Sequence, residues 1–432
     1  MFFDRFAPGR HAVLLNVEFR GAERFDAGEF RELTRSAGID VALDMVARRR
    51  DRHPRLLVGE GKANEVHAAV DGHAADLVLV NEDLTPGQQR NLEGVVGCRV
   101  MTRTELILNI FAERARTFEG KLQVELAQLD HARTRLVRGW THLDRQKGGI
   151  GLRGAGETQI ELDKRMLTDR IRKVRSRLEQ VAARREQGRR RRGRSGAASV
   201  SLVGYTNAGK STLFNALTAA QAVAEDRLFA TLDPTMRKLD VPGTGQVVLA
   251  DTVGFVSRLP HTLIDAFKAT LEEVINADLL VHVVDASAQD AQWRQCEVER
   301  VLAEIGAEAV PLVTALNKSD LIGASHLPSG SSRGAMNQAV HVSAKTGEGL
   351  ERLVETIGAA LGGQAPVSLA LPVSAGRTRA WLYARGAVVG EEVTEDGGTL
   401  LKVRADPRVR AHLDRMLLEE STASEPEESG SG

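Results

Sequence analysis

Short apolar runs alternate with helical patterns near the start of the chain. The apolar runs that have the length of buried strands are residues 11–17, 55–59, 76–80 and 99–101. The segments between them that repeat apolar residues at helical spacing are residues 30–38, 62–70 and 86–96. This order favours a parallel sheet with covering helices, so we predict an N-terminal α/β domain over residues 1–115.

The spacing of apolar positions changes after residue 115. Two stripes then recur at steps of three, four and seven: Leu122, Leu126, Leu129 and Leu136, and later Leu167, Ile171, Val174, Leu178 and Val181. Heptad-like stripes on either side of the glycine-rich segment 148–159 predict two helices that pack as an antiparallel hairpin. We assign residues 116–196 to this hairpin, and we interpret the arginine-rich run 184–194 as a linker or mobile extension.

The second half of the chain returns to alternating strands and helices. The expected strands of a domain over residues 197–363 are 199–204, 246–251, 279–285, 311–317 and 339–343. The pattern predicts a mostly parallel, mixed sheet with helices on both faces. Residues 364–419 combine strand-like 369–373 and 400–405 with helix-like 376–384 and 409–417, which suggests a small α+β domain. The acidic tail 420–432 lacks aromatic residues and is expected to be disordered.

Bulk composition narrows the class of protein only slightly. The chain has 432 residues, 42% of them apolar, and its 58 basic side chains balance 58 acidic ones, so net charge predicts no partner. Its two cysteines, Cys98 and Cys296, have no metal-ligand spacing, which fits a reducing compartment. We expect no signal peptide and no membrane span, and therefore a cytoplasmic protein with possible peripheral association with ribosomes or membranes.

One segment matches the pattern of a phosphate-binding loop. The sequence GYTNAGKS fits G-x-x-x-x-G-K-[ST], follows an apolar strand and precedes a helical segment. Backbone N–H groups of such a loop cradle phosphates, the lysine reaches the β- and γ-phosphates, and the hydroxyl binds Mg²⁺. The predicted nucleotide-binding residues here are Gly204, Tyr205, Thr206, Asn207, Ala208, Gly209, Lys210 and Ser211.

The base is predicted by two further strand ends. NKSD closes one expected strand and SAK closes the next, and ligands of open α/β sheets bind at strand ends. The aspartate can accept from two guanine donors that adenine lacks, and the SAK backbone can donate to the guanine oxygen. The predicted base-binding residues are Asn317, Lys318, Ser319, Asp320, Ser343, Ala344 and Lys345.

The segments between these motifs should bind the metal and sense the γ-phosphate. DTVG places Asp251 at a strand end, where it would hold Mg²⁺ through water, and places the Gly254 N–H at the γ-phosphate. LFATLDPT offers two threonines, Thr231 and Thr235, and spacing alone does not choose between them. The remaining predicted nucleotide contacts are Phe229, Ala230, Leu232, Asp233, Thr252 and Val253.

Five motifs together resemble the HflX family of ribosome-associated GTPases, which is related to Obg. They are GYTNAGKST, LFATLDPT, DTVGF, NKSD and, upstream, GLRGAGETQIELDKR, and the resemblance covers residues 11 to 363. It implies binding of GTP and GDP, association with the large ribosomal subunit and its RNA, and a role in splitting, rescuing or recycling ribosomes. It also selects Thr231 as a metal ligand beside Ser211 and Asp251, which leaves Lys210, Thr231 and Gly254 as the candidate catalytic residues.

Phe255 occupies the position where many GTPases have a glutamine that orients the attacking water. The family likeness implies that an apolar residue is usual here, so intrinsic hydrolysis should be slow and the ribosome should stimulate it. Asn207 raises the further possibility of a bound K⁺, which some GTPases with an apolar residue at this position use in place of an arginine finger.

Two weaker signals lie outside the nucleotide motifs. GIGLRG (149–154) matches a dinucleotide-binding pattern but follows a polar helical stretch, so a hairpin tip that touches RNA backbone through Arg145, Lys147 and Arg153 fits better. Residues 58–66 put glycines and Lys62 between a strand and a helix, and the family likeness links this domain to ATP, although a tight turn is an equal reading. An alternative function remains a GTP-triggered factor that remodels or modifies RNA, which would require extra chemistry.

Overall fold

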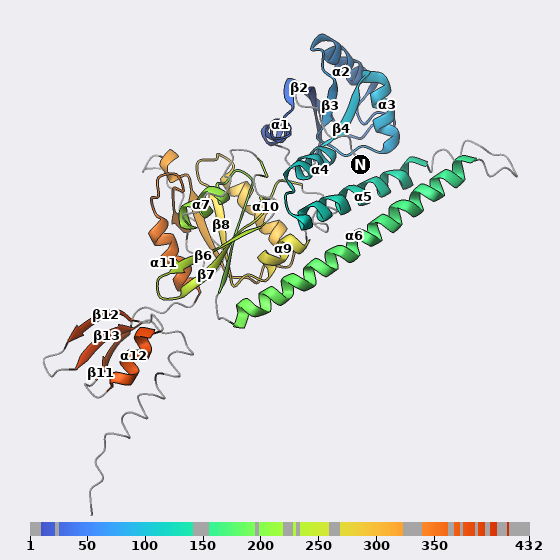
Figure 1. Ribbon diagram of the computed structural model, residues 1–432. Coiled ribbons are helices and arrows are strands. Elements are labelled where there is room, and N and C mark those ends of the chain that lie inside the picture. Colours follow the sequence, from blue (N-terminus) through green and yellow to red (C-terminus); the bar gives the residue numbers. More distant parts are fainter. Residues whose placement is uncertain are drawn as a thin grey trace, which may run out of the picture. The chain divides into compact units, whose positions relative to one another are not determined.

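The computed structural model describes most of the chain. The described residues are 10–21, 26–140, 155–194, 198–218, 228–229, 234–258, 268–322, 339–361, 367–371, 375–384, 388–393, 398–403 and 413. They divide into two compact units. The first comprises Met1–Arg189, Glu225–Asp233 and Val256–Leu271, and the second comprises Arg190–Ala224, Pro234–Phe255 and Glu272–Gly432. Figure 1 labels the helices and strands of both units.

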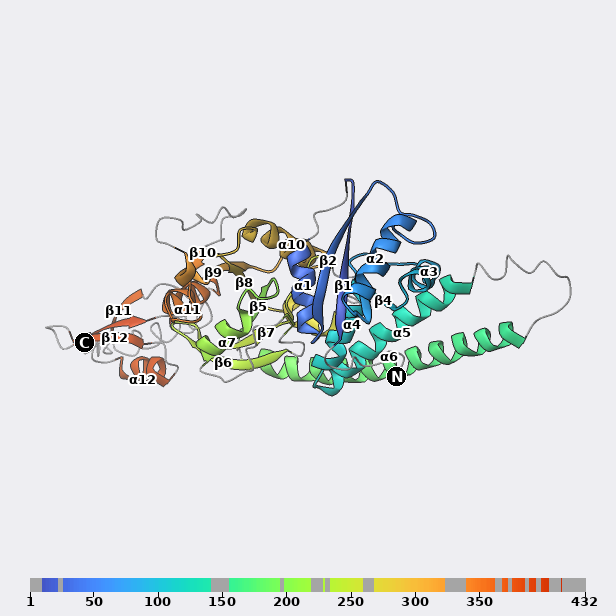
Figure 2. The same ribbon diagram turned by 90° about the horizontal axis from the view of Figure 1, so that it is seen from above.

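The first unit contains a four-stranded, wholly parallel sheet in the order β2-β1-β3-β4. Its strands are β1 (His11–Phe19), β2 (Asp40–Arg49), β3 (Leu77–Val80) and β4 (Arg99–Thr102). Its helices are α1 (Ala27–Ser36), α2 (Glu60–Gly72), α3 (Pro86–Val96) and α4 (Arg103–Arg114). Figure 2 shows β1 and β2 as a long pair. The predicted N-terminal α/β fold is confirmed.

One predicted strand of this sheet is wrong. Residues 55–59 form an irregular segment with a single bridge between His53 and Leu57, and the strand that pairs with β1 is β2. The apolar run is buried at Leu56, Leu57 and Val58. Its apolar character therefore reflects burial, and it does not indicate strand pairing. Leu57 has a φ of 64°, in the left-handed region, and this conformation is incompatible with an extended strand.

Helix α3 is confirmed at its predicted bounds, and its ends explain why. Thr85 caps it and forms a capping box with Gln88, Pro86 occupies its first turn, and Gly97 ends it in the left-handed conformation. Helix α4 has the same kind of start, because Thr102 and Glu105 form a second capping box. This helix was not predicted.

The predicted hairpin is present as α5 (Phe118–Trp140) and α6 (Ala155–Arg194). Its two apolar stripes pack against each other in one cluster: Leu122, Leu126, Leu129, Leu167, Ile171 and Val174, flanked by Leu136 and Leu178. The arginine run 184–194 belongs to α6, which continues to Arg194, and the boundary between the two units falls within this run, so the predicted linker is helical. Arginine is a good helix former, and the two isolated glycines of this run cost too little to end the helix. The predicted RNA-contacting tip at Arg145, Lys147 and Arg153 lies outside the described residues.

The second unit contains a six-stranded sheet in the order β10-β9-β8-β5-β7-β6. Its strands are β5 (Ser199–Gly204), β6 (Thr235–Val241), β7 (Gly245–Asp251), β8 (Leu279–Asp285), β9 (Leu312–Asn317) and β10 (Ala339–His341). Its helices are α7 (Lys210–Thr218), α10 (Ala291–Glu304) and α11 (Leu350–Ala360), together with α9 (Lys268–Ile275), which the two units share, and the short η1 (Ser319–Leu321). Only β6 runs antiparallel to its neighbour, so the predicted mixed, mostly parallel sheet is confirmed.

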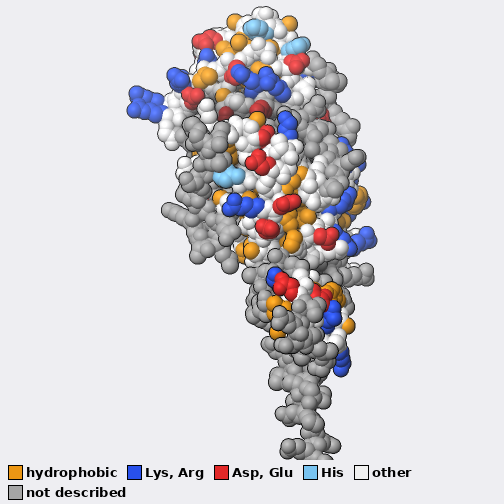
Figure 3. All heavy atoms as spheres, turned by 90° about the vertical axis from the view of Figure 1, so that its left-hand side faces the viewer, with side chains coloured by type: hydrophobic (Ala, Val, Ile, Leu, Met, Phe, Trp, Pro, Cys, Tyr) orange, Lys and Arg blue, Asp and Glu red, His pale blue; other side chains and the backbone are white. Residues whose placement is uncertain are grey.

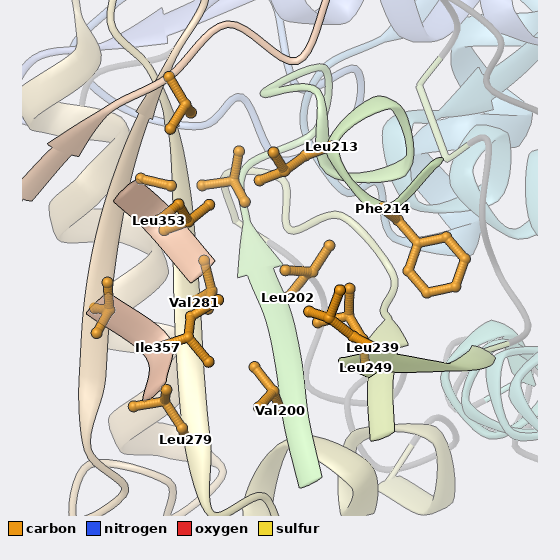
Figure 4. Close-up of a cluster of buried hydrophobic side chains, with 14 of the residues drawn as sticks. Val200, Leu202, Leu213, Phe214, Leu239, Leu249, Leu279, Val281, Leu353 and Ile357 are labelled. Carbon is orange, nitrogen blue, oxygen red and sulfur yellow. The ribbon is translucent and has the colours of Figure 1, made fainter. Parts of the chain in front are cut away.

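Figure 4 shows the core of this sheet, where side chains of β5, β7 and β8 meet those of α7 and α11. Leu202, Val281 and Phe214 are completely buried there. A rigid core of this kind fixes the ends of the strands, from which the loops of a binding site extend.

The C-terminal part of the second unit is a small α+β fold, as predicted. Strands β11 (Val367–Leu371), β13 (Thr399–Val403) and β12 (Val388–Val393) form an antiparallel sheet, and α12 (Gly376–Ala384) packs on it through Leu382. Apart from Leu413, the helix expected at 409–417 and the tail 420–432 lie outside the described residues. Within the described part of the chain, no helix is long and apolar enough to cross a membrane.

Candidate nucleotide-binding site

The predicted phosphate loop connects β5, which ends at Gly204, to α7, which begins at Lys210. Two of its glycines are required by close approach of the backbone to other groups. Gly204 has a φ of 153°, and a Cβ there would lie 2.3 Å from the carbonyl oxygen of Val283. Gly209 has a φ of 91°, and its Cβ would lie 2.3 Å from the amide nitrogen of Asn317. The glycine positions of the motif therefore correspond to steric demands of the loop.

Lys210 is buried inside this loop. Its Nζ donates to the carbonyl oxygens of Gly204 at 3.1 Å and of Tyr205 at 2.8 Å. Burial lowers the pKa of Lys210 from 10.5 to about 8, and the nearby carboxylate of Asp251 opposes this shift. Burying this ammonium costs desolvation energy, which its two carbonyl partners partly offset. Phosphate oxygens of a bound nucleotide would offset the same cost further.

The predicted metal ligands are partly brought together. Asp251 ends β7 and is 1% exposed, and the Ser211 hydroxyl donates to its Oδ2 at 2.7 Å. A hydroxyl and a carboxylate at contact distance are the hard oxygen ligands that Mg²⁺ prefers, so these two residues fit the metal. The third predicted ligand, Thr231, lies outside the described residues.

Phe255 ties the segment after β7 to the phosphate loop. Its N–H donates to the carbonyl of Gly204 at 3.1 Å, and its carbonyl accepts from the N–H of Thr206 at 2.8 Å. Its side chain is 2% exposed. The residue where other GTPases have a glutamine is therefore a buried packing residue, with no polar atom to hold a water.

The neighbouring Gly254 lies directly against the loop. A Cβ on this residue would be 2.9 Å from both Lys210 Nζ and Thr206 Cγ2. Only glycine allows the backbone to approach the loop so closely. The DTVG segment and the phosphate loop are thus adjacent, as their predicted shared role requires.

Asn317 joins the phosphate loop to the two base-binding loops. Its side-chain amide donates to the carbonyl of Ala208 at 2.9 Å, and its Oδ1 accepts from the N–H of Ala344 at 3.0 Å. Asn317 is 2% exposed, so both bonds are shielded from water. Its role is to hold three separate loops in register at the carboxyl edge of the sheet.

Asp320 and Lys318 are oriented by partners of their own. The Ser343 hydroxyl donates to Asp320 Oδ1 at 2.7 Å, and Lys318 Nζ contacts Asp285 Oδ2 at 2.7 Å. Lys318 has a φ of 64°, which turns the chain between β9 and η1. Asp285 was not predicted from the sequence. The available signal was its position at the end of the apolar run of β8, on the same edge of the sheet.

His282 is a second residue that the sequence did not single out. It lies on β8, is completely surrounded by protein, and is close enough to Lys210 for their charges to interact. Burial, and secondarily the positive charge of Lys210, lowers the pKa of His282 to about 4. A neutral histidine therefore lies behind the phosphate loop at physiological pH, and it adds no second positive charge there.

Most predicted site residues are thus found around one edge of the six-stranded sheet. The exceptions are Phe229, which belongs to the first unit, and Ala230, Thr231, Leu232 and Asp233, which lie outside the described residues. The assignment of individual residues to nucleotide atoms stays a prediction.

A glycine-rich loop between strand and helix, an aspartate at the end of the adjacent strand and an NKSD strand end together define a P-loop GTPase domain. The comparisons with known families agree. The family described as "50S ribosome-binding GTPase" matches residues 199–318, and "GTP-binding GTPase N-terminal" and "GTP-binding GTPase Middle Region" match 25–112 and 114–192. "HflX C-terminal domain" matches residues 331–428.

Similar proteins extend over nearly the whole chain. GTPase HflX of Escherichia coli strain K12 is 49% identical over 404 residues, which cover 93% of this chain and 95% of that protein. GTPase HflX of Magnetococcus marinus is 45% identical over 420 residues, covering 94% and 95%. A GTP-binding protein from Sulfolobus solfataricus, solved with GDP, aligns at 22% identity with a TM-score of 0.43, covering 82% of this chain and 99% of that one.

The chain belongs to the HflX family of GTPases. It binds guanine nucleotides and hydrolyses GTP. GTPases of this class in general use a divalent metal such as Mg²⁺.

Asparagine at position 320 should weaken GTP binding while sparing the fold. The substituted amide keeps an oxygen that can accept from Ser343, but it loses the charge that accepts from two guanine donors. Loss of hydrogen bonds to a charged group costs about 1.5–3 kcal/mol, so GTP affinity should fall about 10- to 150-fold. Xanthosine nucleotides should bind the variant better than GTP, because the new amide can donate to the carbonyl oxygen that xanthine has in place of the guanine amine.

The measurement is equilibrium binding of GTP and xanthosine triphosphate to wild type and Asp320→Asn. Asp240→Asn, an exposed position on β6, is the matched control and should bind GTP like wild type. Unchanged GTP affinity of Asp320→Asn would show that another residue reads the base.

Proposed function

We propose that this GTPase binds the large ribosomal subunit and acts in splitting, rescuing or recycling ribosomes, with the nucleotide state setting its affinity. The observation that carries the proposal is the match of residues 199–318 to the family described as "50S ribosome-binding GTPase". The protein's place of action would then be the cytoplasm.

The hairpin is the segment that we assign to ribosomal RNA. Helix α6 is long and carries the most basic run of the chain, residues 184–194. It also leaves Leu162 and Met166 more than half exposed, which is unusual for large apolar side chains. Figure 3 shows one face of the molecule, on which Lys and Arg side chains are interspersed with Asp and Glu side chains. Charge alone therefore does not identify a nucleic-acid-binding surface among the described residues of that face.

We assign the divalent metal to Ser211 and Asp251, with Thr231 as the third residue. The contact between the Ser211 hydroxyl and the Asp251 carboxylate supports this assignment. When bound, Mg²⁺ would neutralise charge on the β- and γ-phosphates. Lys210 would contact the same phosphates from within the loop, and Gly254 would donate its N–H to the γ-phosphate.

Two ligands proposed from the sequence have weaker support. Asn207 is exposed and has a φ of 61°, so its side chain is accessible at the phosphate loop for a K⁺ ion. ATP bound to the first unit would lie at the N-terminus of α2. The residue at the N-cap there is Gly59, so no side-chain hydrogen bond caps the first N–H groups of this helix. A requirement for K⁺ in hydrolysis and ATP binding by residues 1–115 stay predictions.

The alternative of an RNA-modifying enzyme gains no support from Cys98. Burial, with the carboxylates of Asp76 and Glu93 as smaller causes, raises the pKa of Cys98 to about 11. A thiol with so high a pKa is a poor nucleophile at neutral pH, because the thiolate is the reactive form. We therefore keep the ribosome factor as the proposed function.

Binding to large ribosomal subunits should be strong with a non-hydrolysable GTP analogue, weaker with GDP, and sensitive to salt. Removal of a basic side chain that binds one phosphate should flatten the log–log salt dependence by about one unit or less. We expect a variant with Arg145, Lys147 and Arg153 replaced by glutamine to show a flatter dependence. The measurement is co-sedimentation with purified subunits over a range of KCl concentrations.

The matched control replaces three basic residues elsewhere, namely Arg50, Arg237 and Lys238, by glutamine. All three are exposed, and none lies in the hairpin. Equal slopes for the two variants would contradict an RNA contact at the hairpin tip. Absence of co-sedimentation in every nucleotide state would refute the proposed function itself.

A further inference from the structure

Two chain segments next to the predicted γ-phosphate contacts, Thr231 and Gly254, belong to the first unit. Their described residues there are Leu228 and Phe229, shortly before Thr231, and Val256, Ser257 and Arg258, shortly after Gly254. The phosphate loop, Asp251 and Gly254 belong to the second unit. The chain itself therefore connects the nucleotide loops to side chains of the N-terminal domain.

A buried ion pair is hydrogen-bonded to the segment that follows Gly254. Glu29 of α1 and Arg103 of α4 form this pair, and their side chains are only 4% and 6% exposed. The guanidinium also donates to the carbonyl oxygens of Ser257 at 2.8 Å and of Arg258 at 3.2 Å. The Ser257 hydroxyl donates back to the Glu29 carboxylate at 3.0 and 3.2 Å.

The next residue is held in an uncommon conformation by a second charge. Arg258 has a φ of 47°, which non-glycine residues seldom adopt. Its Nη1 lies 2.9 Å from Glu82 Oε1, and the same carboxylate also pairs with Arg52 at 2.7 Å. Backbone strain that persists in a folded protein is maintained by its surroundings, and it clusters at switch regions.

The other sensor segment is held by the same two helices. The Leu228 N–H donates to Ser36 Oγ of α1 at 3.1 Å. Phe229, with a φ of 57°, places its ring edge-on to Phe111 of α4, with the ring centres 4.6 Å apart. Helices α1 and α4 thus hold both segments, one within three residues of Thr231 and the other within four residues of Gly254.

An ordinary stabilising ion pair does not account for these contacts. A buried pair contributes little to stability on average and requires further hydrogen bonds to offset its desolvation. Here Arg103 also donates to the consecutive carbonyl oxygens of Ser257 and Arg258. The planar guanidinium can reach both because its N–H donors form a fork. That geometry fixes a position and an orientation of the backbone.

We propose that Arg103, oriented by Glu29, is a positioning residue for GTP hydrolysis. It fixes the Ser257–Arg258 backbone and thereby places the Gly254 N–H for the γ-phosphate. GDP has no γ-phosphate, so its binding does not depend on this placement. The inference rests on the proposed role of Gly254, and it is independent of ribosome binding.

The test compares affinities for GTP and GDP, and single-turnover GTP hydrolysis, in the full chain without ribosomes. Arg103→Lys keeps a positive charge for Glu29, but an ammonium cannot present the planar fork to two carbonyls. We expect its GDP affinity to be unchanged, and its GTP-to-GDP affinity ratio and hydrolysis rate to fall about tenfold. If the ion pair only stabilised the fold, the variant would lose thermal stability but keep the wild-type GTP-to-GDP ratio.

Arg135→Lys is the matched control, because Arg135 pairs with Glu105 in the same unit at 2.8 Å and does not contact the 257–258 segment through that pair. A second variant, Glu29→Met with Arg103→Met, replaces the pair by apolar groups of similar size and should show the same loss of selectivity. A wild-type GTP-to-GDP ratio in Arg103→Lys, or hydrolysis faster than wild type, would overturn the proposal.

Discussion

Replacing Lys210 by methionine should abolish productive GTP binding and hydrolysis without unfolding the protein. Lys210 is the cation inside the phosphate loop, and methionine matches its length but carries no charge. Loss of one donor that stabilises developing charge costs about 100- to 1000-fold in rate. Binding should fall as well, because the same ammonium is predicted to contact the ground-state phosphates.

The structure explains why the fold should survive this change. The two carbonyls that accept from Lys210 each have another donor: the Phe255 N–H bonds to Gly204, and the Ala208 N–H bonds to Tyr205. Neither acceptor is therefore left without a partner. Methionine also removes the cost of burying a charge, while it gives up two charge-assisted bonds. These effects oppose each other, so the unfolding midpoint should move by only a few degrees.

A pH series provides an internal check on Lys210. Its pKa is lowered from 10.5 to about 8 in the folded state, so between these values the unfolded chain binds more protons than the folded one. Wild-type stability attributable to this group therefore rises with pH across that window, by up to about 3 kcal/mol, and Lys210→Met lacks this rise. Lys238→Met, at an exposed site on β6, is the control. Nucleotide binding by Lys210→Met at wild-type affinity would contradict the assignment.

The central part of the site could be predicted because its residues are contiguous. In GYTNAGKS, the spacing of glycines, lysine and serine is set by one strand-to-helix turn, and the structure places that turn at the end of β5. NKSD was predictable for the same reason, because Asn317 ends an apolar run that can only be a strand in this context. The two motifs then meet through Asn317 and the carbonyl of Ala208, as their shared ligand requires.

Other parts of the site depend on contacts that no local pattern encodes. Asp285 orients Lys318 from a different strand, and the Glu29–Arg103 pair joins helices 74 positions apart in sequence. In the sequence, Arg103 stands at the start of one helix and Glu29 in the first turn of another. Charged residues at such positions are usually exposed, so the sequence does not indicate that these two are buried. Only the tertiary structure reveals that both are buried and that both bind Ser257, Arg103 through the backbone carbonyl oxygen and Glu29 through the hydroxyl.

The same limit explains the wrong strand and the unpredicted helical form of the linker. Residues 55–59 are as apolar as a strand, but burial does not fix hydrogen bonding, and Leu57 turns the chain where a strand would continue. The high charge of the arginine run 184–194 indicates a linker, and the unit boundary does fall there. Charge does not reveal its conformation: arginine favours a helix, and α6 continues through the run.

Large ribosomal subunits should accelerate GTP hydrolysis by this protein by a factor of about 1000 or more. The Phe255 side chain provides no group that could orient the attacking water; the backbone of this residue is hydrogen-bonded to the phosphate loop, and its side chain is buried. Supply of a missing catalytic element in trans is worth about 10³–10⁵ in related GTPases. The purified protein alone should therefore hydrolyse GTP slowly.

Phe255→Gln should not replace the ribosome in this reaction. The side chain at this position is 2% exposed, so a glutamine would be buried, and a buried amide without a hydrogen-bond partner costs about 1–3 kcal/mol. The decisive measurement is single-turnover hydrolysis by wild type and Phe255→Gln, with and without saturating large subunits. Small subunits alone serve as the control and should have little effect. If wild type without subunits already hydrolyses GTP as fast as with them, activation in trans is wrong, and a residue of this chain other than Phe255 must hold the water.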